Sequence, residues 1–335
     1  MPRPKLCGGW VSSRAQRFLG FAIPAEVVNH QFRHLELCCG ESGSTFSPPD
    51  PFGVFVDRAV FDSFLLRHAE NAGVAIKFER AVGIVQSANA ITVQTAKAAH
   101  TAAVAIMCTG AAGSLSASLR PADPPRKSGV CLEQRVPVEF AANWEIPPGT
   151  ARLFFGEIPF GYGWILHHGT YVLIGVGCRR TSSRNLRQYY GQLCDQLALS
   201  DDLRAPQGHP IPLGGFRRLL GRGRCLLAGD AAGFVDAFTG EGISYAIRSG
   251  QLAAEVLTSV SDRDPVGAYQ HACSAEILRP IRQSLWMARV FHHLPRRQLR
   301  RLCENPATAS GYYEILEGRS NYVRYALRQI ARAVL

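Results

Sequence analysis

The chain of 335 residues lacks the long apolar runs that membrane-spanning helices need. No stretch approaches roughly eighteen uncharged apolar residues, and the N-terminal residues MPRPKLCGGW have no apolar segment of the signal-peptide type. A hydrophobic fraction of 47% with 19% charged residues is typical of a globular protein with a large core. These features predict a cytoplasmic protein.

Metal-binding and hydrolase patterns are also missing. The ten cysteines form no C-x-x-C pair, and the adjacent Cys38 and Cys39 have poor spacing for metal ligands. The histidine pairs at 167–168 and 292–293 lack ligand spacing too, so we expect no metal site. No Ser-His-Asp or paired-carboxylate arrangement stands out. We expect free and mostly buried thiols in a reducing compartment.

Acidic residues are scarce in the C-terminal segment. The net charge is +11, and residues 279–335 hold eleven arginines against three acidic residues. The final segment, SNYVRYALRQIARAVL, predicts a helix with an apolar face and a basic stripe. The apolar residues are Val323, Ala326, Leu327, Ile330 and Val334, and the stripe is Arg324, Arg328 and Arg332. This helix either packs its apolar side on the core or contacts an anionic membrane surface, and no nucleic-acid motif accompanies the charge.

Hydrophobic periodicity predicts an α/β core that is interrupted by an antiparallel sheet. Residues 53–95 have a strand–helix–strand pattern, and AVAIMCTG has the continuous apolar run of a buried parallel strand. From about 130 to 180 the pattern alternates and is rich in aromatic residues, which is typical of antiparallel strands. A helix is expected over 184–200.

The order of these elements predicts an insertion topology. An α/β domain comprises residues 1–120 and 211–261, an antiparallel-sheet substrate domain comprises 121–210, and a basic helical region comprises 262–335. Pro280 and Pro295 are expected to interrupt the helices of the last region. Such a topology suits an enzyme that binds a large cofactor at the domain junction.

The stretch CLLAGDAAGFVDAFTGEGISYAIRSG, residues 225–250, carries the strongest site signal. An apolar strand ends at Gly229 and Asp230, and a turn with Gly240 and Gly242 leads into a helix. A ligand crevice in an open α/β sheet has this geometry, because glycines and a helix N-terminus let backbone N–H groups approach a ligand. Alternatively, Asp230 only caps a turn and the glycines serve tight packing.

The charge of this turn narrows the choice of ligand. No Lys or Arg occurs between Arg224 and Arg248, whereas a polyphosphate would favour one in the loop. A polyol hydroxyl on the carboxylate and an electron-rich ring edge at the helix N-terminus fit better. The helix is predicted to have one apolar face, made of Ile243, Ala246, Ile247, Ala253 or Ala254, and Leu257.

GDAAGFVDAFTGEGISYAIRSGQLAAE resembles the C-terminal flavin-binding motif of the geranylgeranyl reductase family, FAD enzymes with a p-hydroxybenzoate-hydroxylase-like fold. Three further segments agree with family segments in order and spacing: PRPKLCGGWVSSRA, VDRAVFDSFLLRHAENAG and IPFGYGWILHHGTYVLIGVG. Together they cover most of residues 2–258, and TGEG distinguishes the chain from hydroxylases of the same fold. The resemblance implies a three-layer, Rossmann-like FAD domain with an inserted antiparallel-sheet domain.

The resemblance also implies cofactor contacts. Asp230, which follows Gly229, would hold the ribityl hydroxyls of FAD, and Gly240, Gly242 and the N–H of Ile243 would face the flavin ring. Arg58 would contact the diphosphate or ribityl region, and Val82 would give a backbone contact to the adenine side.

Other matched positions would surround the reacting part of the flavin. Cys7, Gly8 and Trp10 fall on the loop beside the ring, and Cys7 either donates a proton or only fills space. Tyr162 and Trp164 would wall an apolar substrate tunnel. The neighbouring Phe154, Phe155 and Phe160 either join this tunnel or form ordinary sheet core.

The chain departs from the family pattern at two main places. The family has about forty residues before the PRPK segment, with G-x-G-x-x-G for the FAD pyrophosphate, and no complete copy of this pattern occurs here. We therefore expect an N-terminally truncated FAD domain, from a fragment or a misplaced start, or a degenerate protein that binds FAD poorly. Trp10 replaces a glycine, so it reshapes the pocket or stacks on the flavin. The proline common at Ala237 is also absent.

The resemblance implies hydride transfer from reduced flavin to an alkene of an isoprenoid or lipid-like substrate, with an acid supplying the proton. NAD(P)H or ferredoxin would supply the electrons. A flavin-dependent monooxygenase or halogenase is the alternative enzyme, and a non-catalytic remnant that binds apolar ligands is the alternative outside catalysis.

Overall fold

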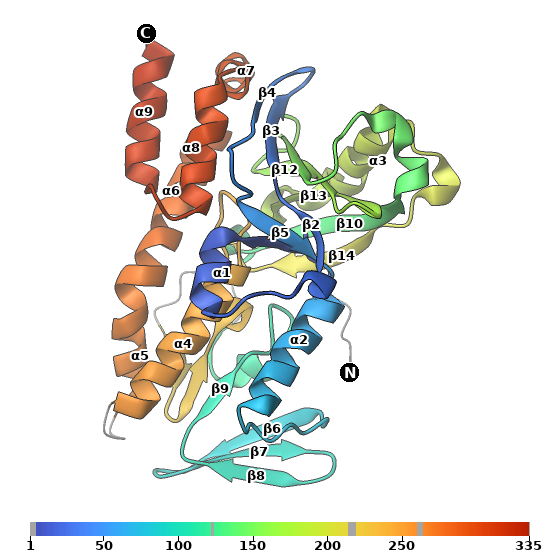
Figure 1. Ribbon diagram of the computed structural model, residues 1–335. Coiled ribbons are helices and arrows are strands. Elements are labelled where there is room, and N and C mark those ends of the chain that lie inside the picture. Colours follow the sequence, from blue (N-terminus) through green and yellow to red (C-terminus); the bar gives the residue numbers. More distant parts are fainter. Residues whose placement is uncertain (1–4, 122–123, 214–218, 260–263, 335) are drawn as a thin grey trace.

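The computed structural model describes residues 5–121, 124–213, 219–259 and 264–334, without the side chains of 117 and 330–334. Residues 2–4 of the PRPK segment therefore lie outside the described residues. Figure 1 shows a large sheet on one side, a stack of C-terminal helices on the other, and a small sheet at the far end of α2. The cavity described below lies where these parts meet.

The N-terminal part forms a three-stranded antiparallel sheet and two helices. The elements are β1 (Trp10–Ser12), α1 (Ser13–Leu19), β2 (Val28–Gln31), β5 (Gly53–Val56) and α2 (Arg58–Asn71). The sheet order is β1-β5-β2. Asp57 caps α2, since its carboxylate accepts a hydrogen bond of 2.7 Å from the N–H of Ala59. The left-handed Gly73, with a φ of 92°, follows the end of α2, as a C-terminal glycine should.

The strand–helix–strand prediction for 53–95 is confirmed in element type. The first strand, β5, pairs with antiparallel neighbours, and residues 74–76, shortly after α2, lie outside the strands. Instead β6 (Ala81–Gln86), β7 (Ile91–Thr95) and β8 (Ala99–Ala102) form a separate antiparallel sheet below α2 (Figure 1).

A short pair of parallel strands precedes the segment with Asp230 that lines the cavity. β9 (Ala105–Met107) runs parallel to β16 (Cys225–Leu227), and β15 (Gly221–Arg222) extends this sheet. The predicted parallel strand in AVAIMCTG is confirmed by this pairing. Its burial is incomplete, because Ile106 is 38% exposed, whereas all three residues of β16 are buried.

The large sheet has seven strands in the order β14-β10-β13-β12-β11-β3-β4. Their bounds are β3 (His34–Cys39), β4 (Ser42–Phe46), β10 (Gly129–Pro137), β11 (Thr150–Phe154), β12 (Gly161–His167), β13 (Tyr171–Arg179) and β14 (Gln207–Ile211). The antiparallel strands expected over 130–180 are confirmed. The sheet also includes β3 and β4 from the first segment, and β3 runs parallel to β11. The predicted helix follows as α3 (Leu186–Gln196) and packs on one face of this sheet.

The helices after the sheet are α4 (Ile243–Ser259), α5 (Pro265–Cys273), α6 (Arg279–His292), α7 (Arg296–Glu304), α8 (Pro306–Leu316) and α9 (Tyr322–Val334). A π-helical turn, Ser274–Leu278, joins α5 to α6. Pro280, which was expected to interrupt a helix, is the second residue of α6 and follows this π-helical turn, so regular α-helical geometry is interrupted directly before it. Pro295 does separate two helices, since it is the N-cap residue of α7.

Short 3-10 helices complete the described elements. They lie at Ala25–Val27, Ser114–Ser118, Pro125–Lys127, Val138–Phe140, Ala142–Trp144, Arg180–Asn185, Asp201–Leu203 and Gly229–Ala231.

The predicted apolar faces of two helices are buried in part. In α4, Ala253 is buried and Ile243, Ile247 and Leu257 pack against the core as predicted, whereas Ala246 is exposed. In α9, Ala326 of the predicted apolar face is buried, whereas Val323 is 47% and Leu327 62% exposed. The side chains of Ile330, Arg332 and Val334 lie outside the described residues.

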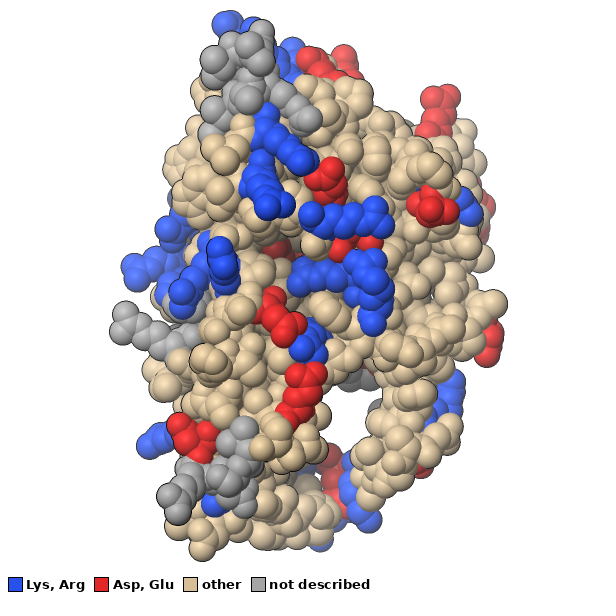
Figure 2. Space-filling view, turned by 60° about the vertical axis from the view of Figure 1, so that its left-hand side comes forward, with Lys and Arg blue, Asp and Glu red and all other residues tan. Residues whose placement is uncertain are grey.

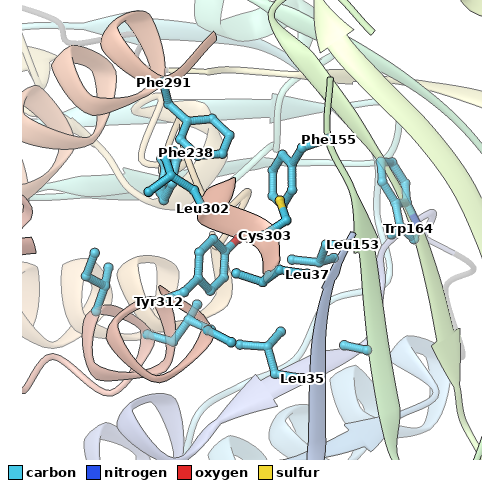
Figure 3. Packing of buried hydrophobic residues seen from close by; sticks show 14 of the residues in the cluster. Leu35, Leu37, Leu153, Phe155, Trp164, Phe238, Phe291, Leu302, Cys303 and Tyr312 are labelled. Atoms are coloured by element: carbon cyan, nitrogen blue, oxygen red, sulfur yellow. The ribbon is translucent and has the colours of Figure 1, made fainter. Parts of the chain in front are cut away.

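The largest core cluster joins the seven-stranded sheet to the C-terminal helices. Figure 3 shows Leu153, Phe155 and Trp164 on the sheet side of this core and Phe291 and Leu302 on the helix side. Burial of each large apolar side chain stabilises the fold by roughly 1.5–3 kcal/mol. This core packs the helical region against the same sheet that lines the cavity, and Leu153 and Trp164 belong to both.

A buried carboxylate ties α9 to the turn before α4. Asp236 is 2% exposed, and it accepts hydrogen bonds from the N–H groups of Phe238 and Thr239 and from the hydroxyl of Tyr322. The Tyr322 bond measures 2.6 Å. Burial raises the pKa of Asp236, and these donors oppose that rise.

Replacement of Tyr322 by Phe removes one donor from the buried carboxylate. We expect the free energy of unfolding of Tyr322→Phe to fall by about 1–3 kcal/mol, because the carboxylate loses a bond that water cannot replace. Urea unfolding followed by circular dichroism measures the change. Tyr189→Phe, at a half-buried tyrosine of α3, is the matched control. An equal effect in both variants would contradict a special role for the Tyr322 hydroxyl.

Candidate functional site

A cavity of about 290 Å³ lies between the loop before β1, the start of α2, the seven-stranded sheet and the turn into α4. Most of the residues singled out from the sequence line it. They are Cys7, Gly8, Trp10, Arg58, Tyr162, Trp164, Asp230, Gly240, Gly242 and Ile243. The structure thus brings together four segments that are far apart in the chain.

Two of the singled-out residues do not line the cavity. Val82 lies on β6 of the small sheet and is 58% exposed, so the structure does not bring it to this site. Gly229 is buried directly behind Asp230, with a left-handed φ of 55°. Its N–H donates to Ser249 at 3.0 Å, so Gly229 turns the chain and anchors it to α4 rather than facing a ligand.

Asp230 stands at the cavity edge as half of an ion pair. The Lys5 ammonium lies 3.0 Å from its Oδ2 atom, and the two side chains are 20% and 15% exposed. The Oδ1 atom lies on the side of Gly242, 3.5 Å from where a Cβ at that position would be. Sequence analysis missed Lys5, although it belongs to the quoted PRPK segment. The pair leaves Oδ1 available as an acceptor for a hydroxyl group.

The TGEG turn is held from both sides. The Tyr162 hydroxyl donates to the carbonyl of Thr239 at 2.8 Å, and a Cβ on the left-handed Gly240 would lie 2.5 Å from that hydroxyl. On the other side, Ser12 donates to Glu241 at 2.9 Å. Burial raises the pKa of Glu241, and Arg14 opposes the rise. The glutamate of TGEG, Glu241, therefore holds the turn in place, while the glycines face the cavity.

Arg58 lines the cavity but is already paired. Its Nε and Nη2 atoms bind the two carboxylate oxygens of Asp62 at 2.9 and 3.0 Å, one helical turn away. Burial opposes the charge of Arg58, but its contacts with Cys7 and Asp62 raise its pKa. The guanidinium remains charged beside Cys7.

A neutral histidine supports the loop that holds Cys7 and Gly8. His168 Nε2 donates to the carbonyl of Gly8 at 3.1 Å, while its Nδ1 accepts from Asn29 at 3.3 Å. Its ring stacks on Tyr171 with centroids 4.5 Å apart. Burial lowers the pKa of His168 to about 3, so the imidazole is neutral at physiological pH.

Trp10 shapes one wall of the cavity. Its ring meets Phe32 edge-on, with centroids 4.0 Å apart. The indole Nε1 is buried, and within the described part of the chain it has no hydrogen-bond partner. A buried donor without a partner beside a cavity fits a site that accepts a hydrogen-bonding ligand.

Glu133 is the site residue that sequence analysis missed most clearly. It lies on β10, lines the cavity and is 3% exposed. The Trp164 indole donates to its Oε2 atom at 3.2 Å, and the backbone N–H of Cys7 also bonds to it. Burial raises the pKa of Glu133 to about 7, although both donors oppose this rise. The sequence signal was weak, because Glu133 is followed by the polar Gln134 and Arg135 in the same strand, CLEQRV.

Glycines of β13 create the space for this contact. Gly175 pairs with both Trp164 on β12 and Glu133 on β10. A Cβ at Gly175 would lie 2.5 Å from the Trp164 ring, and one at Gly177 would lie 3.1 Å from it. The indole therefore lies across two glycines and reaches Glu133 (Figure 3 shows the Trp164 ring beside the sheet).

The aromatic insert divides between cavity and core. Tyr162 and Trp164 line the cavity, whereas Phe155 is buried in the core and Phe154 packs on the α3 side. Phe160 lies under the guanidinium of Arg179, 3.6 Å from ring centroid to the carbon of the guanidinium. The described residues contain no group of three or more metal-ligating side chains.

No protein-family model matches the chain. An uncharacterized protein of Methanosarcina barkeri is 27% identical over 297 residues, which are 87% of this chain and 75% of that protein. Menaquinone reductase of Mycobacterium tuberculosis is 38% identical over 113 residues, 31% of this chain and 28% of that enzyme. The chloroplastic geranylgeranyl diphosphate reductase of Nicotiana tabacum is 23% identical over 268 residues, 72% of this chain and 56% of that enzyme.

Solved structures agree over almost the whole chain. A geranylgeranyl bacteriochlorophyll reductase-like protein of Thermoplasma acidophilum has a TM-score of 0.81 at 18% identity, with 99% of this chain and 87% of that chain covered. The flavin-dependent brominase Bmp2 has a TM-score of 0.69 at 16% identity over 99% and 91% of the chains. CtdE in complex with FAD and a substrate has a TM-score of 0.65 at 13% identity over 99% and 91%.

The fold is therefore that of the FAD-dependent oxidoreductases. Within this class, the resemblance to the geranylgeranyl reductases that the motifs indicated is confirmed by the similarity to a named geranylgeranyl diphosphate reductase and to a reductase-like structure. The chain spans 56% of the Nicotiana enzyme and 28% of the mycobacterial one, so their substrates are properties of those proteins.

Replacement of Gly175 by Ala tests how β13 accommodates Trp164. We expect Gly175→Ala to lower the free energy of unfolding by about 1–3 kcal/mol and to shift the tryptophan emission, because its Cβ would collide with the indole. Gly163→Ala is the matched control, since a Cβ there would meet its neighbours at 3.6 Å or more. Urea unfolding and fluorescence spectra measure both variants. Equal behaviour of the two would show that the ring does not need the space above Gly175.

Proposed function

We propose that the chain is a FAD-dependent reductase that saturates alkene bonds of an isoprenoid or similar lipid-like chain. The observation that carries this proposal is one cavity in which the flavin motif faces an aromatic wall. Asp230, Gly242 and Ile243 line this cavity from the turn and start of α4, and Tyr162 and Trp164 line it from the seven-stranded sheet. The names of the chloroplast and mycobacterial relatives support a prenyl-type substrate.

The residues of the cavity fit a flavin. Asp230 offers Oδ1 to a ribityl hydroxyl, and the N–H groups at Gly242 and Ile243 stand at the N-terminus of the 17-residue helix α4, which favours partial negative charge. Trp10 lines the same cavity from β1. A bound flavin would supply the hydride, and the electrons would come from NAD(P)H or reduced ferredoxin.

The walls of the cavity suit an apolar substrate. Leu153 and Leu166 join Tyr162 and Trp164 on the sheet, and Phe61 and Leu65 of α2 lie among the other lining residues. An unactivated alkene has no polar group for the protein to bind, so shape and exclusion of water are the protein's means of orienting it. The polar groups of the chain would then bind the cofactor and supply the proton that completes the reduction.

The same proposal includes peripheral contact with an anionic membrane surface through α6 and α9. Trp286 and Val290 of α6 are 47% and 39% exposed, and Val323 and Leu327 of α9 are also exposed. These helices pack together. None of the described helices is long and apolar enough to cross a bilayer.

Arginines surround these exposed apolar residues. Figure 2 shows Lys and Arg side chains gathered on the face that carries the C-terminal helices. Arg282 and Arg289 of α6 and Arg324 and Arg328 of α9 are exposed. Arg328 is bound to Glu314 at 2.7 Å, so part of this charge is compensated within the protein. Basic side chains beside exposed apolar ones favour anionic lipid headgroups, and a lipid-like substrate would be reached from that surface.

Loss of the Asp230 carboxylate should abolish flavin retention. We expect Asp230→Ala to raise the dissociation constant for FAD by roughly 10- to 100-fold, because a charged acceptor contributes about 1.5–3 kcal/mol to a hydrogen bond. Flavin absorbance after gel filtration and FAD titration measure this. Asp201→Ala, at a side chain that is 94% exposed, is the control. FAD binding equal to that of the parent chain would refute the role of Asp230.

Removal of exposed apolar residues from α9 should weaken vesicle binding. We expect Val323→Ser/Leu327→Ser to lower binding to phosphatidylglycerol-containing vesicles at least several-fold, because exposed apolar area and basic charge act together. Co-sedimentation at low and high salt measures this. Phe78→Ser/Val85→Ser removes comparable exposed apolar groups, 65% and 56% exposed, from outside this face. Absence of vesicle binding by the parent chain would contradict the membrane contact and leave the flavin site unaffected.

A further inference from the structure

The cavity wall holds a carboxyl group that neither the flavin motif nor the substrate residues account for. Glu133 lies on β10 and lines the cavity beside the loop of Cys7. It is 3% exposed, and no ion pair with an arginine or lysine involves it among the described residues. A buried acid without a salt-bridge partner, aimed into a reaction cavity, requires a physical explanation.

Residues from three separate parts of the chain determine the position of the Glu133 side chain. Trp164 of β12 donates its indole N–H to Oε2 at 3.2 Å, and Trp164 reaches that point only because Gly175 and Gly177 leave room beneath the ring. The backbone N–H of Cys7 bonds to the same side chain from the N-terminal loop. Both donors bind the carboxyl while leaving it on the cavity surface.

Several charged and titratable groups surround Glu133, and Arg135 is among the influences that lower its pKa. Arg135, on the same strand, forms an ion pair with Asp57 at an N–O distance of 2.5 Å. Its guanidinium carbon lies 4.7 Å from the ring centroid of Tyr171. Cys131 faces the same side, and burial raises the pKa of its thiol to about 12, so that thiol is neutral. His209 of β14 and the Arg58–Asp62 pair also line the cavity. Burial, the largest influence on Glu133, raises its pKa to about 7.

We propose that Glu133 is the proton donor for the alkene reduction. This inference rests on the proposed function. Reduction of a C=C bond adds a hydride to one carbon and a proton to the other, and the hydride comes from the reduced flavin, which is thereby oxidised. The O–H bond of the Glu133 carboxyl breaks as the new C–H bond forms, and its electron pair stays on the carboxylate. Solvent returns the proton before the next turnover.

The geometry distinguishes Glu133 from Cys7, the donor suggested by sequence alone. The Cys7 side chain contacts the Arg58 guanidinium, while its backbone N–H supports Glu133. Cys7 therefore positions Glu133 and contributes to the wall. Two donors hold the carboxyl in the cavity surface, as a group that must present one proton repeatedly should be held.

The proton donor must be protonated before each turnover. Since burial raises the pKa of Glu133 to about 7, the acid form is populated below this value and is lost as the pH rises through it. We therefore expect kcat to fall on the alkaline side of about pH 7 in the parent chain. The Trp164 indole should report the same ionisation, because it is bonded to the carboxyl.

The test uses the chain loaded with FAD, anaerobic dithionite as reductant and geranylgeranyl diphosphate as the probe. We expect Glu133→Gln to retain FAD as the parent does but to lower kcat about 10²- to 10⁴-fold. The fall of kcat above about pH 7 should be absent from this variant. Glu133→Asp keeps an acid in the wall and should restore part of the rate with its pH dependence. Glu139→Gln, at an exposed glutamate beyond the same strand, is the control and should match the parent.

A second measurement does not depend on turnover. The chain has four tryptophans, so subtraction of the Trp164→Phe spectrum isolates the Trp164 emission. This emission should change with a midpoint near pH 7 in the parent and lose that transition in Glu133→Gln. Parent-like kcat in Glu133→Gln, or no such transition in the parent, overturns the assignment. A parent chain that binds no FAD, or whose reduced flavin is not reoxidised by the probe, refutes the proposed function and the proton donor with it.

Discussion

The buried carboxylate of Asp236 is the constraint on which the site depends. It binds the N–H groups of Phe238 and Thr239 and the hydroxyl of Tyr322, so it shapes the turn before TGEG and holds α9 against that turn. The backbone of Asp236 also bonds to Gly240 and Glu241. Because a carboxyl group this deeply buried is stable only with its hydrogen-bond donors in place, loss of these bonds would disturb the turn, the helix and the glycines that face the cavity.

The cavity combines two kinds of structure with different tasks. The turn into α4 presents backbone N–H groups and one carboxylate, which suit the polar and electron-rich parts of a flavin. The seven-stranded sheet presents Tyr162, Trp164 and leucines, which suit an apolar chain. Tyr162 joins the two, since its hydroxyl binds the carbonyl of Thr239 while its ring lines the cavity. Any movement of the sheet against the turn would change cofactor and substrate walls at once.

Sequence reasoning succeeded where the signal was local. Residues 225–250 form one strand, one turn and one helix, so their spacing alone placed Asp230, Gly240 and Gly242 at a site. It failed where partners came from distant segments. Lys5 meets Asp230, and Glu133 meets Trp164, across separations that no periodicity records. The sequence left open whether Val323 and Leu327 are buried for a related reason, because the buried face of α9 is selected by its neighbours, among them α6 and α8.

The sequence by itself determined the class of fold, the order of the main elements and the flavin-type motif, since these depend on residue type and short-range spacing. Only the tertiary structure decided which residues complete the cavity. A strand buried on both faces has no alternation to mark its inner side, so the position of Glu133 facing the cavity depends on the pairing of β10 with β13 and on the glycines under Trp164. The protonation state of that carboxyl follows from burial, which exists only after the chain has folded.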